Sequence, residues 1–182
     1  MKTALRYLAC VVILAAALAA IHAYVVIPFR CNQEKKRATQ TTTEAFKYTG
    51  SFAAIQSGRA TMIRLAPCFR AGCLDVPLYM AMAANARLAG RSDEAIRLYT
   101  EALELDHRPE IYYNLAEAQL QLGRRVEAYH NYIEAVLFNP FFLHEIDDGD
   151  LRSRVYQQVI QRRPREKEFY KYVNETPVLN WH

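Results

Sequence analysis

Cysteine is the residue type in this sequence with the clearest capacity for covalent chemistry, because two of the four cysteines lie close together. Cys68 and Cys73 are separated by four residues in the segment PCFRAGC. A disulfide between them would close a short loop in an oxidising compartment. The alternative is a pair of half-buried free thiols at the end of a helix. The sequence alone leaves both states open.

Three aspartates that lie close together, Asp147, Asp148 and Asp150, could bind a cation through their carboxylates. The other ligands of a calcium-binding loop are absent, including its closing glutamate at the required spacing. Carboxylates also stabilise the amino end of a helix, and an apolar stripe over residues 151–162 predicts a helix at that place. We therefore expect these aspartates to cap a helix rather than to bind a metal.

Histidines and nucleophiles form no catalytic constellation in this sequence. His107, His130 and His144 are isolated, and the cysteines lack the histidine spacing of a zinc or haem site. No phosphate-binding glycine loop and no serine or cysteine nucleophile motif occurs. We predict that the protein is not an enzyme and that it uses no cofactor, no metal and no small-molecule substrate.

Composition and charge indicate the class of fold that holds these residues. The chain has 182 residues with 52% hydrophobic residues, six glycines and seven prolines, which predicts a folded, all-α chain with one modest domain and an appendage. The net charge is +4, and basic and acidic side chains are interleaved. This balance argues against nucleic acid as a partner.

The amino-terminal segment, residues 1–30, contains an apolar run without a charged residue from Tyr7 to Phe29. As a helix this run would reach roughly 34 Å, enough to cross a hydrocarbon core of about 30 Å. We expect an uncleaved single-pass membrane anchor. The alternative is a secretory signal peptide cleaved near Ala20, but the apolar run continues further than such a signal requires.

The orientation of the anchor has two opposing indicators. Lys2 and Arg6 precede the apolar run, whereas a larger basic group follows it between residues 30 and 37, and this distribution favours a cytoplasmic domain. The cysteine pair favours an oxidising compartment. We expect the domain to lie outside the cytoplasm, in a periplasmic position, with Cys68 and Cys73 bonded to each other.

Two segments connect the anchor to the rest of the chain. Residues 31–43 are polar and rich in threonine, glutamine and lysine, and we interpret them as a juxtamembrane linker. Residues 44–75 contain helical apolar spacing from Glu44 to Ala66, followed by Pro67 and the cysteine loop. We expect this region to form a capping helix that packs on the domain.

An internal repeat occupies residues 76–140. Shifting the chain by 33 residues gives nine identities over 32 positions, which indicates two copies of one structural unit, residues 76–108 and 109–140. The identical pairs are Tyr79 and Tyr112, Ala83 and Ala116, Gly90 and Gly123, Arg91 and Arg124, Glu94 and Glu127, Ala95 and Ala128, Tyr99 and Tyr132, Glu101 and Glu134, and Ala102 and Ala135.

Each unit has the pattern of two antiparallel helices. In the second unit we expect helices over residues 111–122 and 126–138, joined at Gly123, which tolerates the left-handed backbone of a helix stop. Alanines on both helices allow a close approach, and aromatic residues fill the remaining space between the helices. Pro140 closes the unit.

At these residues the sequence resembles the tetratricopeptide repeat (TPR) family. The second unit matches the family motif at Tyr112, Leu115, Ala116, Gly123, Ala128, Tyr132, Ala135 and Pro140. The first unit matches it at Tyr79, Met82, Ala83, Gly90, Ala95, Tyr99 and Ala102, but has His107 in place of the closing proline. The repeat is 33 residues long, whereas the family standard is about 34. The resemblance implies a short TPR-type α-solenoid that binds proteins.

Two such units need flanking helices, because each repeat buries the exposed face of its neighbour. We expect residues 44–75 to cap one end. Residues 141–182 supply a capping helix at the other end, followed by a tail around Tyr170, Tyr172 and Trp181. The fold class expected from the whole sequence is therefore all-α, with a transmembrane helix before a TPR-type solenoid and its caps.

The resemblance also implies a groove, lined by first-helix residues that point away from the repeat core. On this chain they are Met80, Ala84, Arg87, Tyr113, Glu117 and Leu120. Their mixed apolar character fits an amphipathic helix or an apolar strand of a partner protein. The alternative for Met80 and Leu120 is packing beneath the flanking caps.

From these features we expect a membrane-tethered scaffold for protein interactions, with a partner from a membrane or envelope assembly. The alternative function is a permanent accessory subunit of such a complex. The tail around Tyr170, Tyr172 and Trp181 is the alternative binding site.

Overall fold

The computed structural model describes residues 2–175, without the side chains of residues 2–6, 8 and 9, and is all-helical within that range. The prediction of an all-α chain is confirmed for this part of the protein. Its elements are α1 Lys2–Ile21, the π-helix η1 His22–Val26, α2 Ile27–Phe46, α3 Phe52–Arg70, α4 Val76–Leu88, α5 Ser92–Leu105, α6 Pro109–Gln121, α7 Arg125–Phe138, the 3₁₀-helix η2 Pro140–Leu143, α8 Gly149–Arg162, the 3₁₀-helix η3 Pro164–Glu166 and α9 Lys167–Glu175.

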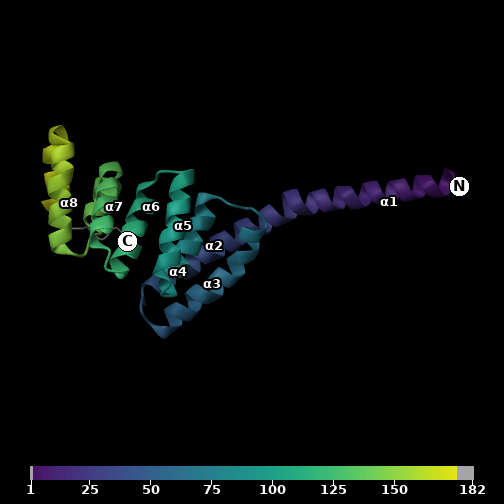
Figure 1. Cartoon of the computed structure of the whole chain (residues 1–182), viewed down its shortest axis with the longest axis horizontal. Coiled ribbons are helices and arrows are strands. Elements are labelled where there is room, and N and C mark those ends of the chain that lie inside the picture. Colours follow the sequence, from purple (N-terminus) through teal and green to yellow (C-terminus); the bar gives the residue numbers. More distant parts are fainter. Residues whose placement is uncertain (1, 176–182) are drawn as a thin grey trace.

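Helix α1 projects away from the remaining helices, as Figure 1 shows. The continuous helix from Cys10 to Phe46 has a mean hydropathy of 2.6 over its most apolar stretch, and none of that stretch is buried. Branched apolar side chains such as Ile13 and Leu14 are 68% and 61% exposed. The helix is therefore long and apolar enough to cross a bilayer.

The helix does not stop at the end of the apolar run, because η1 and α2 continue it to Phe46. The prediction of a linker over residues 31–43 is wrong: these residues lie within α2, which packs on α3 and α4. Threonine hydroxyls bond back to the carbonyl one turn earlier, as in the 2.6 Å bond from Thr42 to Ala38. Ala38 and Thr42 are buried. The polar composition of the segment reflects one exposed face rather than the absence of structure.

The expected helix from Glu44 to Ala66 is also corrected, because the chain turns over between α2 and α3. Gly50 adopts φ +85° in this turn, a backbone region that favours glycine. Ser51 then caps α3 by accepting a hydrogen bond from the amide of Ala54 at 3.1 Å. Pro67 lies inside the last turn of α3 and does not end the helix there.

The two repeated segments each form one antiparallel pair, α4 with α5 and α6 with α7. The helices α6 and α7 lie close to the expected residues 111–122 and 126–138. Gly123 ends α6 with φ +71°, and Gly90 does the same after α4 with φ +75°. The predicted left-handed stop at Gly123 is confirmed. Successive pairs pack side by side in the order of the sequence (Figure 1).

Small residues form the contacts between the paired helices. Six alanines at repeated positions have no exposed surface: Ala83, Ala95, Ala102, Ala116, Ala128 and Ala135. Tyr99 and Tyr132, also at repeated positions, are fully buried beside them. The core therefore combines close backbone approach at alanine with large rings that fill the remaining volume.

The carboxy-terminal region continues beyond the second pair through η2, α8 and α9. Asp148 is the N-cap of α8 and accepts a hydrogen bond from the amide of Leu151 at 3.0 Å, which confirms the expected capping by this acidic cluster. Tyr170 is fully buried and Tyr172 is 65% exposed, whereas Trp181 lies outside the described residues. Tyr170 is thus a core residue.

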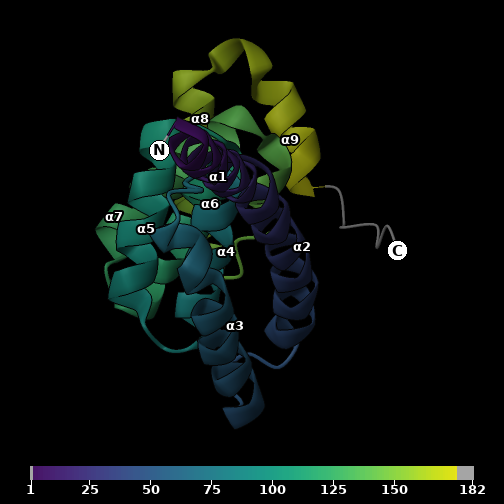
Figure 2. The same cartoon turned by 90° about the vertical axis from the view of Figure 1, so that its right-hand side faces the viewer.

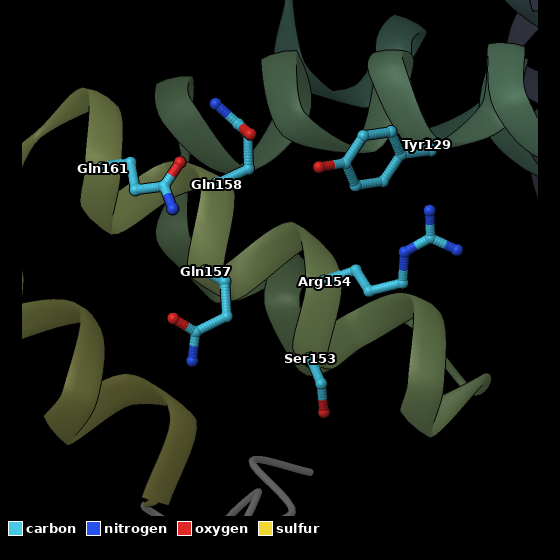
Figure 3. A pocket seen from close by; sticks show the side chains of 6 residues that line it. All are labelled: Tyr129, Ser153, Arg154, Gln157, Gln158 and Gln161. Carbon is cyan, nitrogen blue, oxygen red and sulfur yellow. The ribbon is translucent and has the colours of Figure 1, made fainter.

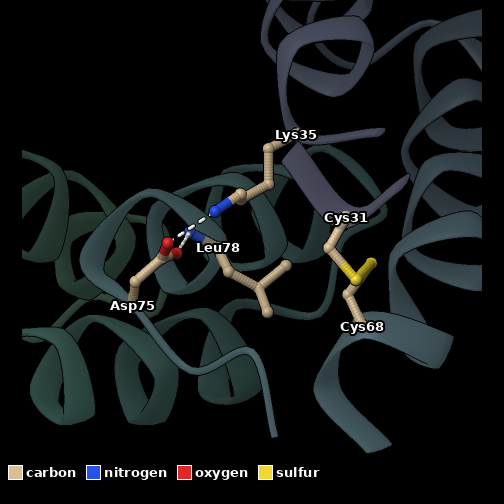
Figure 4. Close-up of a disulfide and its surroundings, with 5 residues drawn as sticks. All are labelled: Cys31, Lys35, Cys68, Asp75 and Leu78. Carbon is tan, nitrogen blue, oxygen red and sulfur yellow. Dashed lines mark hydrogen bonds and ion pairs between the residues drawn. A yellow bond between two sulfur atoms is a disulfide. The ribbon is translucent and has the colours of Figure 1, made fainter. Parts of the chain in front are cut away.

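A disulfide joins Cys31 of α2 to Cys68 of α3, with a Cα–Cα distance of 5.4 Å (Figure 4). The expected pairing of Cys68 with Cys73 is therefore wrong, and Cys73 is a half-buried free thiol. The pairing differs because Cys68 faces α2, whereas Cys73 follows the end of α3. Beside the disulfide, Lys35 forms a 2.5 Å ion pair with Asp75, the N-cap of α4. These two links fasten α2 to the helices that follow it.

Candidate protein-binding surface

One face of α4 and α6 carries all six residues predicted to line the groove. They are Met80, Ala84 and Arg87 on α4, and Tyr113, Glu117 and Leu120 on α6. Each is half-buried, whereas Ala83 and Ala116 beside them are fully buried. The spacing of three to four residues places each set on one side of its helix. Figure 2 shows α4 and α6 between α5 and α7 on one side and α2 and α9 on the other.

A charged pair joins the two helices at this face. Arg87 Nη1 lies 3.4 Å from a carboxylate oxygen of Glu117. The other carboxylate oxygen of Glu117 accepts a hydrogen bond from the hydroxyl of Tyr132 on α7. The guanidinium of Arg87 also stacks over the ring of Phe46 on α2, 4.7 Å from its centre. The pair therefore connects four helices rather than standing free for a partner.

The tyrosines around this pair act as neutral groups. Burial raises the pKa of Tyr132, and the hydrogen bond to Glu117 raises it further. Burial also raises the pKa of Tyr99 to about 12, against the opposing effect of Arg87. Both hydroxyls stay protonated at physiological pH. The charge on this face therefore comes from Arg87 and Glu117.

Tyr113 is less open than the sequence indicates, because η2 and the turn after it lie over it. Its ring stacks on Phe142 with a centroid distance of 4.9 Å, and its hydroxyl donates to the carbonyl of Glu145 at 2.9 Å. Met80 packs against the first core cluster and Leu120 against the second. These three residues share a packing role. Among the apolar residues of the face, Ala84 does not pack against either core cluster. It is therefore the best site for probing the face.

Two hollows of the described surface lie away from these six residues. The larger, of about 300 Å³, lies between α7 and α8 (Figure 3). Its lining is rich in amides and consists of Tyr129, Ser153, Arg154, Gln157, Gln158 and Gln161. Arg154 extends toward the ring of Tyr129, 5.4 Å from its centre. This hollow is open, and its side chains form no catalytic arrangement.

The smaller hollow, of about 250 Å³, lies where α2 and α3 meet at their shared turn. Its lining is mainly apolar and consists of Thr41, Glu44, Ala45, Tyr48, Ala53, Ala54 and Ser57. Tyr48 and Phe52 beside it are 67% and 77% exposed. Large exposed aromatic side chains at one end of a domain are typical of a contact surface.

No family model, curated protein or solved structure matches this chain. The likeness to TPR proteins therefore depends on the residues of the two repeated segments alone. Within residues 2–175, no three His, Cys, Asp or Glu side chains are placed to hold a metal ion.

Sequence reasoning missed three residues that shape this surface. Phe46 lies in the region that was expected to form a capping helix, and its specific contact with Arg87 was not expected. Phe142 lies in residues 141–182, which were expected to form a capping helix and a tail, and its position over Tyr113 was not expected. The hydroxyl of Tyr132 was overlooked because the residue was assigned to the core. The repeat itself carried a signal for Tyr132, since a buried tyrosine hydroxyl usually has a hydrogen-bond partner.

Proposed function

We propose that this protein is a membrane-tethered module of TPR type that holds a partner protein on the face of α4 and α6. The observation that carries the proposal is the state of the six groove residues, which share one face and are all half-buried. Residues in this state offer apolar area to a partner without exposing the core. The length and apolar character of the helix from Cys10 to Phe46 support the tethering.

The chemistry of the face favours an apolar segment as the bound element. Met80 and Leu120 pack in part against the core clusters but keep some apolar surface exposed, and Ala84 leaves room for a partner side chain. The charges of Arg87 and Glu117 neutralise each other across the face. An amphipathic helix or an extended apolar segment of a partner therefore fits this face better than an acidic terminus.

The disulfide between Cys31 and Cys68 supports a domain outside the cytoplasm, because structural disulfides persist in oxidising compartments. The basic residues after the span favour the opposite orientation. We give the disulfide more weight, because both of its cysteines are 4% exposed and are held by packed helices. The proposed position is periplasmic or extracellular. The absence of enzymatic activity remains a prediction.

A pair of charge substitutions tests the binding face. Ala84→Glu places a carboxylate at the centre of the face, whereas Thr100→Glu places one on the exposed surface of α5. After chemical cross-linking in native membranes, partner recovery should fall strongly for Ala84→Glu and stay normal for Thr100→Glu. Both variants should keep the melting temperature of the unmodified protein within a few degrees. Full recovery with a folded Ala84→Glu variant would exclude this face as the binding site.

A second candidate function is a permanent subunit of a membrane complex. The exposed Tyr48, Phe52 and Ile63 favour it, because they place apolar surface at the end of the domain beyond the groove. Gentle solubilisation followed by size measurement separates the two functions. A stoichiometric complex that survives dilution indicates a subunit, and a lone protein indicates a reversible tether.

A further inference from the structure

The turn between α3 and α4 lies level with the end of the apolar helix. The disulfide brings the Cα atoms of Cys31 and Cys68 to 5.4 Å, and Cys31 follows the last residue of the apolar run, Phe29, by two positions. The amide of Cys73 donates to the carbonyl of Cys68 at 3.1 Å, so the turn folds back over the same point. In Figure 1 this turn is the part of the domain that lies nearest to α1.

The domain also overlaps the apolar run itself. Val26 and Ile27 are half-buried, and Ile27 packs against the first core cluster, although both precede Phe29. A helix rises about 1.5 Å per residue, so Ile27 and Phe29 differ in depth by only about 3 Å. Each headgroup layer of a bilayer is about 5–8 Å thick. If the apolar run spans the bilayer, this end of the domain must therefore reach the headgroup layer.

The side chains at this end have the composition of a membrane contact. Leu74 is 48% exposed although it is a large apolar residue. Arg30 at the start of α2 and Arg70 at the end of α3 are both exposed. Basic residues next to an exposed apolar residue are typical of surfaces that bind anionic headgroups and reach the acyl boundary.

The acidic groups nearby do not oppose such a contact. Asp75 pairs with Lys35 at 2.5 Å and accepts a hydrogen bond from the amide of Leu78 at 2.9 Å. Glu34 pairs with Arg37 at 2.9 Å. Both carboxylates are compensated within the chain, which leaves the charges of Arg30 and Arg70 to set the local potential.

We propose that the turn over residues 70–74 is a second membrane contact, with Leu74 at the boundary between headgroups and acyl chains. Arg30 and Arg70 bind the phosphates of the bilayer that holds α1. This contact fixes the tilt of the domain on the membrane. The inference rests on the membrane anchoring proposed above.

Tryptophan fluorescence in nanodiscs tests the contact on the full chain. Trp181, the single tryptophan of the sequence, is first replaced by Phe, and one tryptophan is then introduced at a chosen site. Leu74→Trp reports on the proposed contact. Phe29→Trp reports on the end of the span, and Tyr48→Trp reports on the far turn between α2 and α3, where the side chain is 67% exposed.

In nanodiscs that contain brominated phospholipid, Phe29→Trp and Leu74→Trp should both lose emission relative to unbrominated nanodiscs. Both should also emit at shorter wavelength than Tyr48→Trp, because their indole rings lie in the bilayer. Tyr48→Trp should keep the emission that it has in unbrominated nanodiscs. Quenching at Phe29→Trp without quenching at Leu74→Trp overturns the second contact and leaves the anchor intact. Absence of quenching at Phe29→Trp overturns the anchor and with it the contact.

Charge reversal tests the role of the two arginines. Leu74→Trp should be quenched more strongly in nanodiscs with phosphatidylglycerol than in nanodiscs of phosphatidylcholine alone. Adding Arg30→Glu and Arg70→Glu should remove this difference, whereas Arg59→Glu, on the exposed surface of α3 further from the membrane, should preserve it. Non-reducing electrophoresis verifies that the disulfide is intact in each variant. An unchanged lipid dependence after the double reversal overturns the assignment of phosphate binding to these residues.

Discussion

The pair α2 and α3 and the pair α6 and α7 have the same antiparallel arrangement but are held together by different chemistry. In α6 and α7 the contact is made by fully buried alanines such as Ala116 and Ala128, with Tyr132 between them. In α2 and α3 the contact includes a disulfide from Cys31 to Cys68. The repeated pair thus depends on shape, whereas the pair next to α1 has a covalent bond in addition to its packing.

The contacts that join α2 and α3 to α4 also differ from the alanine contacts within the repeated pair. Helix α2 reaches α4 through specific polar contacts, a 2.7 Å hydrogen bond from Asn85 to Thr42 and the ion pair of Lys35 with Asp75. Helix α3 reaches α4 at Gly58, where an added Cβ would lie 2.7 Å from the carbonyl oxygen of Asn85. The antiparallel arrangement of α2 and α3 is therefore reached without the repeated sequence.

Among the changes that test this difference, loss of the disulfide should have the largest effect on the free energy of unfolding. Replacing Cys31 and Cys68 with Ala should lower the free energy of unfolding by about 2–4 kcal/mol, since the bond closes a long loop in the unfolded chain. Reductant should have a similar effect on the unmodified protein and none on the variant, measured by denaturant unfolding. Cys73→Ala should retain the response to reductant. Equal stability with and without the bond would show that packing alone holds α2 and α3.

Overpacking the repeated pair should have the next largest effect. Ala128→Leu adds three carbons at a position with no exposed surface and should cost about 1–3 kcal/mol of unfolding free energy. Val126→Leu is the matched control, because Val126 is 69% exposed on the same helix. Thermal unfolding followed by circular dichroism measures both. An unchanged melting temperature for Ala128→Leu would contradict the dependence of this pair on small residues.

The substitution Gly58→Ala adds a single methyl group and tests the close approach of α3 to α4. The added Cβ meets backbone atoms that cannot move aside freely, and this clash outweighs the gain in helix propensity, for a net loss of about 1 kcal/mol. Gly149→Ala, where an added Cβ meets nothing within 4 Å, should be neutral or slightly stabilising. Chemical denaturation of the two variants gives the comparison. Equal stability of both variants would show that α3 can shift without loss.

The smallest effect concerns the polar start of α8, a third way of fixing a helix. A backbone hydrogen bond from Leu151 and the side chain of Arg125 hold the pKa of Asp148 below its ordinary value. Asp148→Asn keeps a good N-cap but removes the charge, so its melting temperature should be slightly lower at pH 7. Because the folded pKa is lowered, the contribution is present above the unfolded pKa and disappears as the pH falls through the folded pKa. The two melting curves should therefore converge in acid, and a constant difference would contradict the role of the charge.

The sequence predicted the helices α4 to α7 well because the two copies reinforce each other. A glycine at the stop and alanines along both helices have a direct local meaning, and Gly123 and Ala128 could be placed from them. The helix α2 was not predicted, because its stabilising partners lie far away in the sequence. Asn85, which binds Thr42, follows it by 43 residues. The local composition of residues 31–43 cannot predict a contact with a residue so distant in the sequence.

The sequence indicated which residues of the candidate surface share a helix face, but not the contacts that they make. The spacing of Met80, Ala84 and Arg87 predicted that they share one side of α4, since helical periodicity fixes directions within one element. The cover over Tyr113 depends on how η2 folds back, and the partner of Cys68 depends on the turn between α2 and α3. Both require tertiary structure that periodicity does not describe.

The continuous helix from α1 through η1 to α2 has a mechanical consequence. A flexible linker would let the domain swivel independently of its anchor, but an unbroken helix transmits torque. Phe46 at the far end of this helix stacks on Arg87 at the face of α4. If the apolar part of this helix spans a bilayer, a rotation or tilt imposed on it is transmitted through the helix to Phe46 and thus to the edge of that face.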